Sequence, residues 1–272
     1  MNYPHTIQIV FGFFIGILVS LLAKKAKTLD TSGAIAAALT GGAIFAFGGF
    51  PWAAVLLTFF ISSSLLSKFF RIRKESISEK FAKGNERDWG QVLANGLLGT
   101  IFVVSTLFFR QSSIPWLGFI GAMATVNADT WATELGVLNP SAPRLITNFH
   151  PVEAGTSGGI SLLGTLSTMG GALLIGLIGA LFNHQVIWYS LALISLGAGL
   201  AGSLFDSLLG ASLQAIYYCK TCAKETERHP VHSCGNRTHH LRGLQWLNND
   251  AVNFLASLVG AGIAIAIGLL LA

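Results

Sequence analysis

Long apolar stretches alternate with short polar segments along the whole chain. Eight of these stretches approach or exceed the roughly 20 residues that a helix needs to cross a bilayer. They cover residues 7–23, 32–49, 52–69, 91–109, 114–137, 159–182, 186–217 and 249–271. The pattern predicts an all-α integral membrane protein with about eight transmembrane helices, folded as a single polytopic domain over residues 1–272.

Two of these stretches carry further local signals. Lys24, Lys25 and Lys27 follow the first stretch instead of preceding it, so we expect a retained helix and not a signal peptide. The Gly49–Phe50–Pro51 segment predicts a tight turn between the second and third helices. The seventh stretch is long for one crossing, and we expect it to tilt, to kink near its glycines or to extend beyond the bilayer.

The composition agrees with a membrane protein. The 272 residues are 52% hydrophobic and only 11% charged, whereas roughly a quarter of the residues of a soluble domain are charged. The Lys and Arg residues also have a strongly uneven distribution. The loops after the first, third, fifth and seventh helices, with Lys68 at the edge of one, hold all but Arg110 of the 17 basic residues. Basic loops lie in the cytoplasm, which predicts a multi-pass protein of the cell membrane with both termini external. The net charge of +5 is then a matter of topology, and we expect no nucleic-acid partner.

The remaining polar residues gather in five segments, and each lies at a predicted cytoplasmic helix end. The segments are residues 86–96, 127–136, 155–161, 206–214 and 248–253. Their positions were not used to orient the chain. The arrangement therefore predicts a polar active face on the cytoplasmic side of the membrane.

Asp129 and Glu134 end an otherwise apolar helix. A regular helix would place them about 140° apart, so they share a face only if the helix unwinds. They could simply emerge into water, but a helix C-terminus disfavours anions. Half-buried acids without basic partners need a cation, and Mg²⁺ is the hard cation that oxygen ligands suit best.

Two further helices carry polar residues four positions apart. Asp206 and Gln214 flank Gly210 on one helix face, which indicates either a ligand-lined face or close helix packing. Arg87, Gln91 and Asn95 repeat the same spacing, which suits an oxyanion. Arg87 could equally be one of several surface basic residues.

Two other segments are candidates for phosphate binding at helix starts. The first comprises Gly155, Thr156, Ser157, Gly158 and Gly159, where backbone N–H groups and a helix dipole would favour phosphate. It is not a Walker motif, and Ser157 could instead be an N-cap. The second comprises Asn249, Asp250 and Asn253, of which helix capping would explain only one.

The cytoplasmic loop over residues 218–248 contains all three cysteines. Cys219 and Cys222 have the spacing of a zinc half-site, and Cys234 follows with His232 two residues before it. A Cys₃His set predicts a structural Zn²⁺, with free thiols as the alternative. His229, His239 and His240 could replace His232.

The motifs QVLANG, ADTWATELG, PRLIT…GTSGGIS, GSLFDSLLGASLQ and NNDAVN occur in this order over residues 87–253. In these motifs the chain resembles an integral-membrane family of formerly unknown function that includes plant phytyl-phosphate kinase. The resemblance implies that Asp129, Glu134, Asp206 and Asp250 belong to the active region, with Arg144 among the phosphate-binding residues. It also implies a membrane kinase that transfers a phosphoryl group from CTP or ATP to a prenyl monophosphate. The cysteine-containing loop departs from the plant enzyme, so the natural substrate need not be phytyl phosphate.

The residues themselves suit such a reaction. A phosphate monoester is mostly dianionic at neutral pH and needs charge neutralisation more than a base. A cytidylyltransferase that forms a CDP-lipid would use the same groups. A secondary transporter is less consistent with the sequence, because neither an acid at the membrane midplane nor an internal repeat is evident. The sequence leaves the oligomeric state open.

Overall fold

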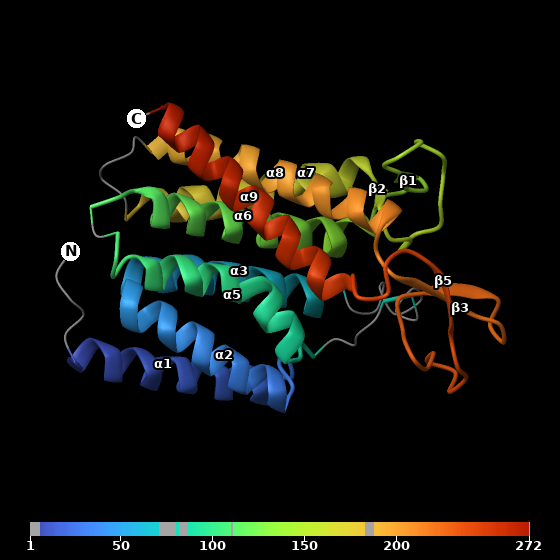
Figure 1. Ribbon diagram of the computed structural model, residues 1–272, viewed down its shortest axis with the longest axis horizontal. Coiled ribbons are helices and arrows are strands. Elements are labelled where there is room, and N and C mark those ends of the chain that lie inside the picture. Colours follow the sequence, from blue (N-terminus) through green and yellow to red (C-terminus); the bar gives the residue numbers. More distant parts are fainter. Residues whose placement is uncertain (1–5, 71–79, 82–85, 110, 183–187, 272) are drawn as a thin grey trace.

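The computed structural model describes residues 6–70, 80–81, 86–109, 111–182 and 188–271. In these ranges eight α-helices run up and down along one common direction (Figure 1). They are α1 (Thr6–Lys25), α2 (Thr31–Ala43), α3 (Phe50–Phe69), α5 (Trp89–Ser105), α6 (Ile114–Gly136), α7 (Leu162–Ala180), α8 (Trp188–Ser212) and α9 (Asn249–Leu270). A π-helical turn, η1 (Ile44–Gly48), continues α2.

Each predicted apolar stretch corresponds to one of these helices, although α5 begins at Trp89 and ends at Ser105 instead of covering residues 91–109. Six of them are long and apolar enough to cross a membrane, namely α1, α2 with η1, α3, α7, α8 and α9. Helix α5 is apolar but has 17 residues. Helix α6 is instead the interior helix of the bundle, because every residue from Leu117 to Ala128 is buried.

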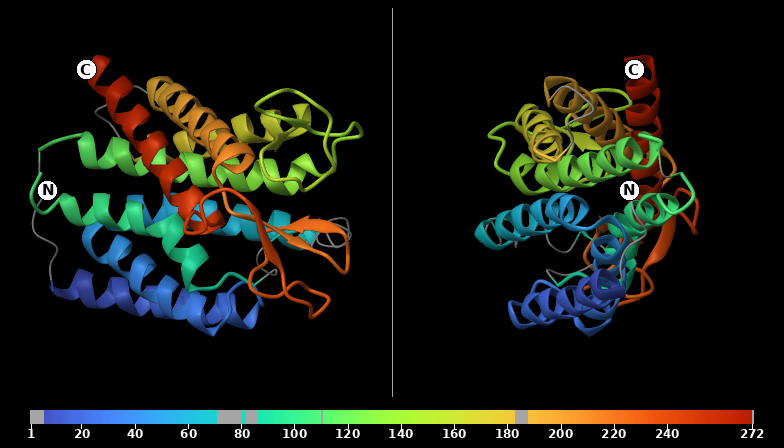
Figure 2. Two further views of the ribbon diagram at one scale, coloured as in Figure 1. Left: turned by 45° about the vertical axis from the view of Figure 1, so that its right-hand side comes forward. Right: turned by 90° about the vertical axis from the view of Figure 1, so that its left-hand side faces the viewer.

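The helices form layers around α6. The two views in Figure 2 place α1 and α2 on one flank, α3 and α5 next to them, and α7, α8 and α9 beyond α6. The core consists of apolar side chains from several layers. Trp52 of α3 packs against Trp116 and Phe119 of α6, with ring centroids 4.9 and 4.7 Å apart. Packing of this kind fixes α6 against its neighbours on both sides.

Short strands correct two helix boundaries and the expectation of an all-α fold. Strand β1 (Arg144–Leu145) pairs with β2 (Gly159–Ile160), so α7 begins at Leu162 and not at residue 159. Helix α8 ends at Ser212, and the apolar residues that follow form β3 (Ile216–Cys219) instead of continuing the helix to residue 217. Isoleucine and tyrosine favour strands, and β3 has two partners to pair with. The expected start of this stretch at residue 186 lies outside the described residues.

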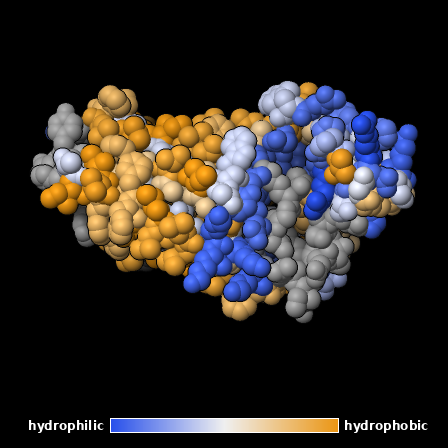
Figure 3. Space-filling model, turned by 90° about the horizontal axis from the view of Figure 1, so that it is seen from below, coloured by the Kyte–Doolittle hydropathy of each residue, from blue (hydrophilic) through white to orange (hydrophobic). Residues whose placement is uncertain are grey.

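Strand β3 is the centre of a three-stranded antiparallel sheet with β4 (Lys224–Thr226) and β5 (His239–Arg242). All the strands lie at one end of the bundle (Figure 1). Figure 3 shows hydrophilic residues at this end and hydrophobic residues over most of the remaining face. We call it the polar end. The start of α1 and the end of α9 lie at the opposite end (Figure 1).

Candidate active site

A cleft of about 990 Å³ opens at the polar end. Residues from all five polar segments of the sequence line it. They are Arg87, Gln91, Asn95, Asp129, Glu134, Gly155, Thr156, Ser157, Gly158, Gly159, Asp206, Asn249, Asp250 and Asn253. The helical bundle therefore brings together side chains that are far apart in the sequence.

A smaller cavity of about 10 Å³ is lined by four of these side chains. Asn95, Asp129, Asp206 and Asn253 reach it from four different helices, α5, α6, α8 and α9. Its volume is close to that of a single water molecule or ion. The Oδ2 atom of Asp206 is buried and has no hydrogen-bond partner among the described residues. Two carboxylates and two amides around one small space are a suitable oxygen donor set for Mg²⁺.

Close helix packing next to this cavity positions its two acids. A side chain at Gly202 of α8 or at Gly260 of α9 would overlap the Thr125 side chain of α6. Thr125 donates a hydrogen bond to the Gly121 carbonyl at 2.9 Å and also contacts the Ala198 carbonyl of α8 at 3.3 Å. Asp129 and Asp206 lie one helical turn beyond Thr125 and Gly202. Gly202 and Gly260 therefore allow the helices to pack closely, and this close packing positions Asp129 and Asp206.

Glu134 has a different environment from Asp129. It is buried, and Ser67 of α3 donates a hydrogen bond to its Oε1 atom at 2.7 Å. Arg87 interacts with it electrostatically, and the guanidinium lies 5.5 Å above the Phe59 ring. Burial lowers the pKa of Arg87, while the charge of Glu134 acts in the opposite direction.

The three acids expected to share a cation therefore divide into two groups. Asp129 accepts a hydrogen bond from Ser203 of α8 at 3.3 Å and lines the small cavity with Asp206. Glu134 lies toward α3 and Arg87. This is the separation that a regular helix imposes on residues five apart. Asp129 and Asp206 therefore lie together at the small cavity, and Glu134 lies apart from them, where its charge acts on Arg87.

The glycine-rich loop rests on the end of α8. Gly155 and Gly158 have φ angles of +78° and +82°, which other residues rarely adopt. A Cβ atom at Gly158 would lie 2.5 Å from the backbone nitrogen of Ala211. Ser157 is not a helix cap, because its Oγ donates to Gln214 Oε1 at 2.9 Å. Ser161 caps α7 instead.

Helix capping explains two other polar residues. The Gln91 side chain accepts a hydrogen bond from the Asp88 backbone, and Asp88 accepts one from the Gln91 backbone, which is a complete capping box for α5. Gln91 therefore has a structural role besides its place in the cleft. Asn248 caps α9. The three polar residues after it, Asn249, Asp250 and Asn253, line the cleft without serving as the cap.

Two residues expected at the site do not line the cleft. Arg144 is exposed, and its guanidinium donates to the Phe149 carbonyl at 2.9 Å, which closes its own loop. Gln214 is buried and joins the glycine-rich loop to Glu227, to which it donates a hydrogen bond at 2.7 Å. Both contacts stabilise the fold, and neither partner, Phe149 or Glu227, could be expected from the sequence.

The cleft also has residues that the sequence analysis missed. Glu227, Arg228 and His229 come from the cysteine-containing loop, and Ser67 and Ser203 come from helices. All five lie outside the polar segments that the sequence singled out. The only signal for the first three is their position between two pairs of metal-ligating residue types.

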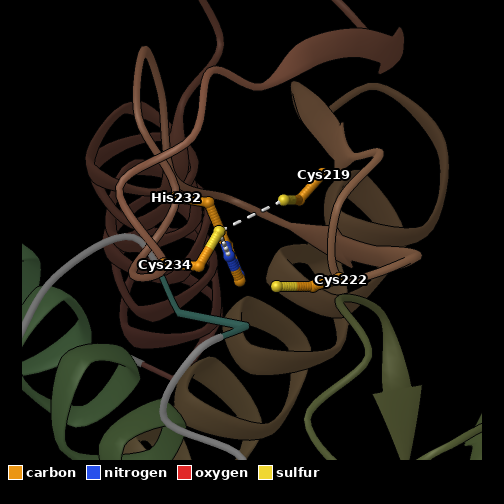
Figure 4. A group of neighbouring side chains, drawn as sticks. All are labelled: Cys219, Cys222, His232 and Cys234. Atoms are coloured by element: carbon orange, nitrogen blue, oxygen red, sulfur yellow. Dashed lines mark hydrogen bonds between the residues drawn. The ribbon is translucent and has the colours of Figure 1, made fainter.

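The cysteine-containing loop brings its four predicted ligands together (Figure 4). One ligand atom from each of Cys219, Cys222, His232 and Cys234 lies within 4.8 Å of the others. Hydrogen bonding to His232 lowers the pKa of the Cys234 thiol to about 6, whereas a hydrogen bond to Cys234 raises that of Cys222 to about 11. His229 stacks on Tyr217 instead of joining the group.

The chain is similar to a family of membrane proteins and to several known members. The family model described as Integral membrane protein DUF92 matches residues 14–261. Protein PGR of Arabidopsis thaliana is 35% identical over 95% of this chain and 96% of its own length. An uncharacterized membrane protein of Methanocaldococcus jannaschii is 33% identical over 96% and 97%. The chloroplastic protein VTE6 of Arabidopsis thaliana is 25% identical over 87% of this chain and 64% of its own length. No solved structure matches the chain.

Proposed function

Since the chain belongs to the family of the Integral membrane protein DUF92, we propose that it is a membrane kinase acting on an isoprenoid monophosphate. This family is the one that the sequence motifs indicated, and it includes plant phytyl-phosphate kinase. The proposed reaction transfers the terminal phosphoryl group of a nucleoside triphosphate to the lipid phosphate. Its products are a prenyl diphosphate and a nucleoside diphosphate.

One observation carries the proposal. Two acids and two amides from four helices, together with Thr125, Val126 and Ala256, line a cavity of about 10 Å³ beside a cleft of about 990 Å³. The buried Oδ2 atom of Asp206, which has no hydrogen-bond partner in the described parts of the chain, fits a bound cation. Asp129 and Asp206 would hold Mg²⁺, with Asn95 and Asn253 beside it. The ion, when bound, supplies positive charge between two anionic reactants.

Other residues of the cleft supply phosphate contacts. The loop at Gly155–Gly159 and the start of α7 line the cleft, and α7 adds the positive end of a helix dipole, although the N–H groups of Thr156 and Gly159 already donate within the loop. Arg228 adds a cation, and its Nε atom is buried with no hydrogen-bond partner in the described residues. A phosphate monoester needs no base to act as a nucleophile at neutral pH. These residues therefore need only bind, orient and neutralise the two phosphates.

The position of the cleft suits a lipid substrate. It opens at the polar end of the bundle, and hydrophobic residues cover most of the rest of the face seen in Figure 3. A prenyl tail could stay in the bilayer while its phosphate enters the cleft. This arrangement also favours a lipid phosphate over a soluble one.

Product analysis tests the proposal. Purified protein would be incubated with Mg²⁺, one nucleoside triphosphate at a time and prenyl monophosphates of several chain lengths, including phytyl phosphate. We expect a prenyl diphosphate and a nucleoside diphosphate by mass, and no product when EDTA removes Mg²⁺. A CDP-linked lipid with released pyrophosphate would instead identify a cytidylyltransferase. Well-folded protein that forms neither product from any pair would contradict both activities.

A further inference from the structure

We propose that one structural Zn²⁺ is bound by Cys219, Cys222, His232 and Cys234, and that this ion holds one wall of the cleft in place. The wall is the segment Glu227–His229, which lies between the two pairs of ligands. The zinc site is independent of the proposed kinase activity. It rests on the residues of the loop alone.

The distances within the group fit a tetrahedral metal centre. The Sγ atoms of Cys219 and Cys234 are 3.6 Å apart, and His232 Nδ1 lies 3.3 Å from Cys234 Sγ. Ligands at about 2.3 Å from a tetrahedral Zn²⁺ would be about 3.8 Å apart. A disulfide needs about 2.05 Å between the sulfur atoms, and all three cysteines are free. The group is thus arranged for a shared ion and not for a covalent bond.

His232 gives independent support for a metal. Its side chain is only 3% exposed, and its Nε2 atom is buried with no hydrogen-bond partner among the described residues. Buried polar atoms are normally paired, and one that lacks a protein partner calls for a bound ion or water. A cation coordinated through Nε2 would satisfy this atom directly, whereas coordination through Nδ1, the nitrogen that lies 3.3 Å from Cys234 Sγ, would leave the Nε2–H to a bound water.

The buried apolar residues of the loop are confined to its two ends, at Cys219 and Leu247. Residues 220–246 are all described, and none of the hydrophobic residues among them is buried. Val231 and Leu241, for example, are 45% and 49% exposed. Three strands of three or four residues cannot hold such a segment by themselves. Small modules without a core are commonly held by a metal or by disulfides.

Tight turns present the ligands in two pairs. Cys219 ends β3, and Cys222 lies in the turn before β4, where Ala223 adopts a φ angle of +53°. In the second pair the His232 N–H donates to the Asn236 carbonyl, and the Gly235 N–H donates to the His232 carbonyl, each at 2.9 Å. The ion would join these two turns and so close the segment that lies between them.

That closed segment is the cleft wall. Glu227 follows β4 directly and accepts the hydrogen bond from Gln214, which in turn accepts one from Ser157 of the glycine-rich loop. His229 stacks on Tyr217 with ring centroids 4.4 Å apart. Arg242, at the end of β5, donates to the Gly210 and Ala211 carbonyls at the end of α8. The folded loop therefore sets the position of Arg228, His229 and the loop contact at Ser157.

Metal analysis tests the site. Protein purified without chelator should hold about one Zn²⁺ per chain, and cobalt substitution should give thiolate-to-metal charge-transfer absorption. Cys222→Ser and His232→Ala should lose the metal, whereas His232→Cys, with four thiolates, should keep it. Thr221→Ala, an exposed residue between two ligands, is the matched control. Absence of zinc from the wild-type protein, or full zinc content in Cys222→Ser, would overturn the site.

Limited trypsin digestion tests the wall. Removal of zinc should raise the rate of cleavage after Arg228 by about tenfold or more, because cleavage follows local opening. Cleavage after the exposed Arg144, outside the loop, should not change and serves as the internal control. An unchanged rate of cleavage after Arg228 would contradict the proposal that zinc holds this wall in place. Neither measurement needs turnover. Protein that holds zinc but transfers no phosphate would contradict only the proposed kinase activity. Active protein without zinc would contradict only the zinc site.

Discussion

At the scale of single residues, Asp206 is the most informative side chain. It lies in α8, which is apolar and long enough to cross a membrane. Its Oδ2 atom is buried without a hydrogen-bond partner in the part of the chain that the structure describes. Asp129 lines the same small cavity, so two carboxyl groups share one small space there. Such an arrangement is unfavourable for stability alone and is typical of a site that binds a cation.

Replacement of Asp206 by Asn should therefore separate function from stability. The substitution keeps the shape of the side chain and removes its charge, so Mg²⁺ should bind weakly and turnover should fall by at least ~10²-fold. The melting temperature should stay the same or rise, because the repulsion between the acids is relieved. Kinase assays and thermal unfolding in detergent measure the two effects.

Asp88→Ala is the matched control. Asp88 caps α5, and loss of this cap should lower stability by about 1 kcal/mol. Turnover per folded molecule should change little. An Asp206→Asn variant that unfolds more readily than the wild type while its folded fraction stays fully active would identify a structural acid instead.

The residue types of the site could be predicted, but not all their roles. Asp129, Asp206, Asn95 and Asn253 stood out because polar residues are conspicuous at the ends of apolar stretches. Arg144 has the same chemistry as a phosphate ligand, yet its guanidinium closes its own loop. Arg228 could not be recognised, because its place in the cleft depends on strand pairing and on the fold of the cysteine-containing loop.

At the scale of elements, α6 is the helix on which the others pack. Its residues Leu117–Ala128 are all buried, and α9 crosses it (Figure 2) with Gly121 next to Gly260. A Cβ atom on Gly121 would lie 2.5 Å from the Gly260 carbonyl oxygen. Hydrophobicity predicted both helices well. It could not predict the end of α8, because the apolar residues of β3 continue the same stretch. The spacing of hydrophobic residues alone does not distinguish a buried strand from a buried helix.

The close contact between α6 and α9 predicts that a single added methyl group on α9 lowers stability. Gly260→Ala should lower stability by about 1–3 kcal/mol, because the new Cβ atom would overlap Thr125. Gly262→Ala on the same helix should be neutral or slightly stabilising, since nothing described lies within 4 Å of its Cβ position and alanine favours helices. Thermal unfolding of both variants measures the difference. Equal stabilities would contradict the close packing of α6 and α9.

At the scale of the whole molecule, charge and structure divide the bundle in the same way. The cleft and all the strands lie at the polar end, and the start of α1 and the end of α9 lie at the other (Figure 1). By sequence, all the Lys and Arg residues except Arg110 belong to loops assigned to one side; Arg110 lies outside the described ranges, as do Arg71, Arg73, Lys74 and Lys83 on the other side. We expect this side to be the cytoplasm.

Labelling of intact cells with a membrane-impermeant maleimide tests the orientation. Gln111→Cys, in the exposed connection between α5 and α6, should be labelled from outside. Ser141→Cys, exposed at the polar end, should be labelled only after lysis. Wild-type protein gives the background from the three native cysteines. Labelling of Ser141→Cys in intact cells would reverse the orientation and place the cleft outside.

The lengths of the connections have a consequence for how such a molecule can diverge. Away from the cleft, Gly49 alone joins η1 to α3, whereas residues 137–161 and 213–248 form long connections at the cleft. The helices supply the acids and amides, and these connections supply the walls. An ancestral bundle could therefore lengthen, shorten or exchange a wall and acquire a new lipid preference without repacking a single helix. Such changes would leave the acids and amides of the helices untouched, provided that the phosphate contacts at Gly155–Gly159 and Arg228 are kept.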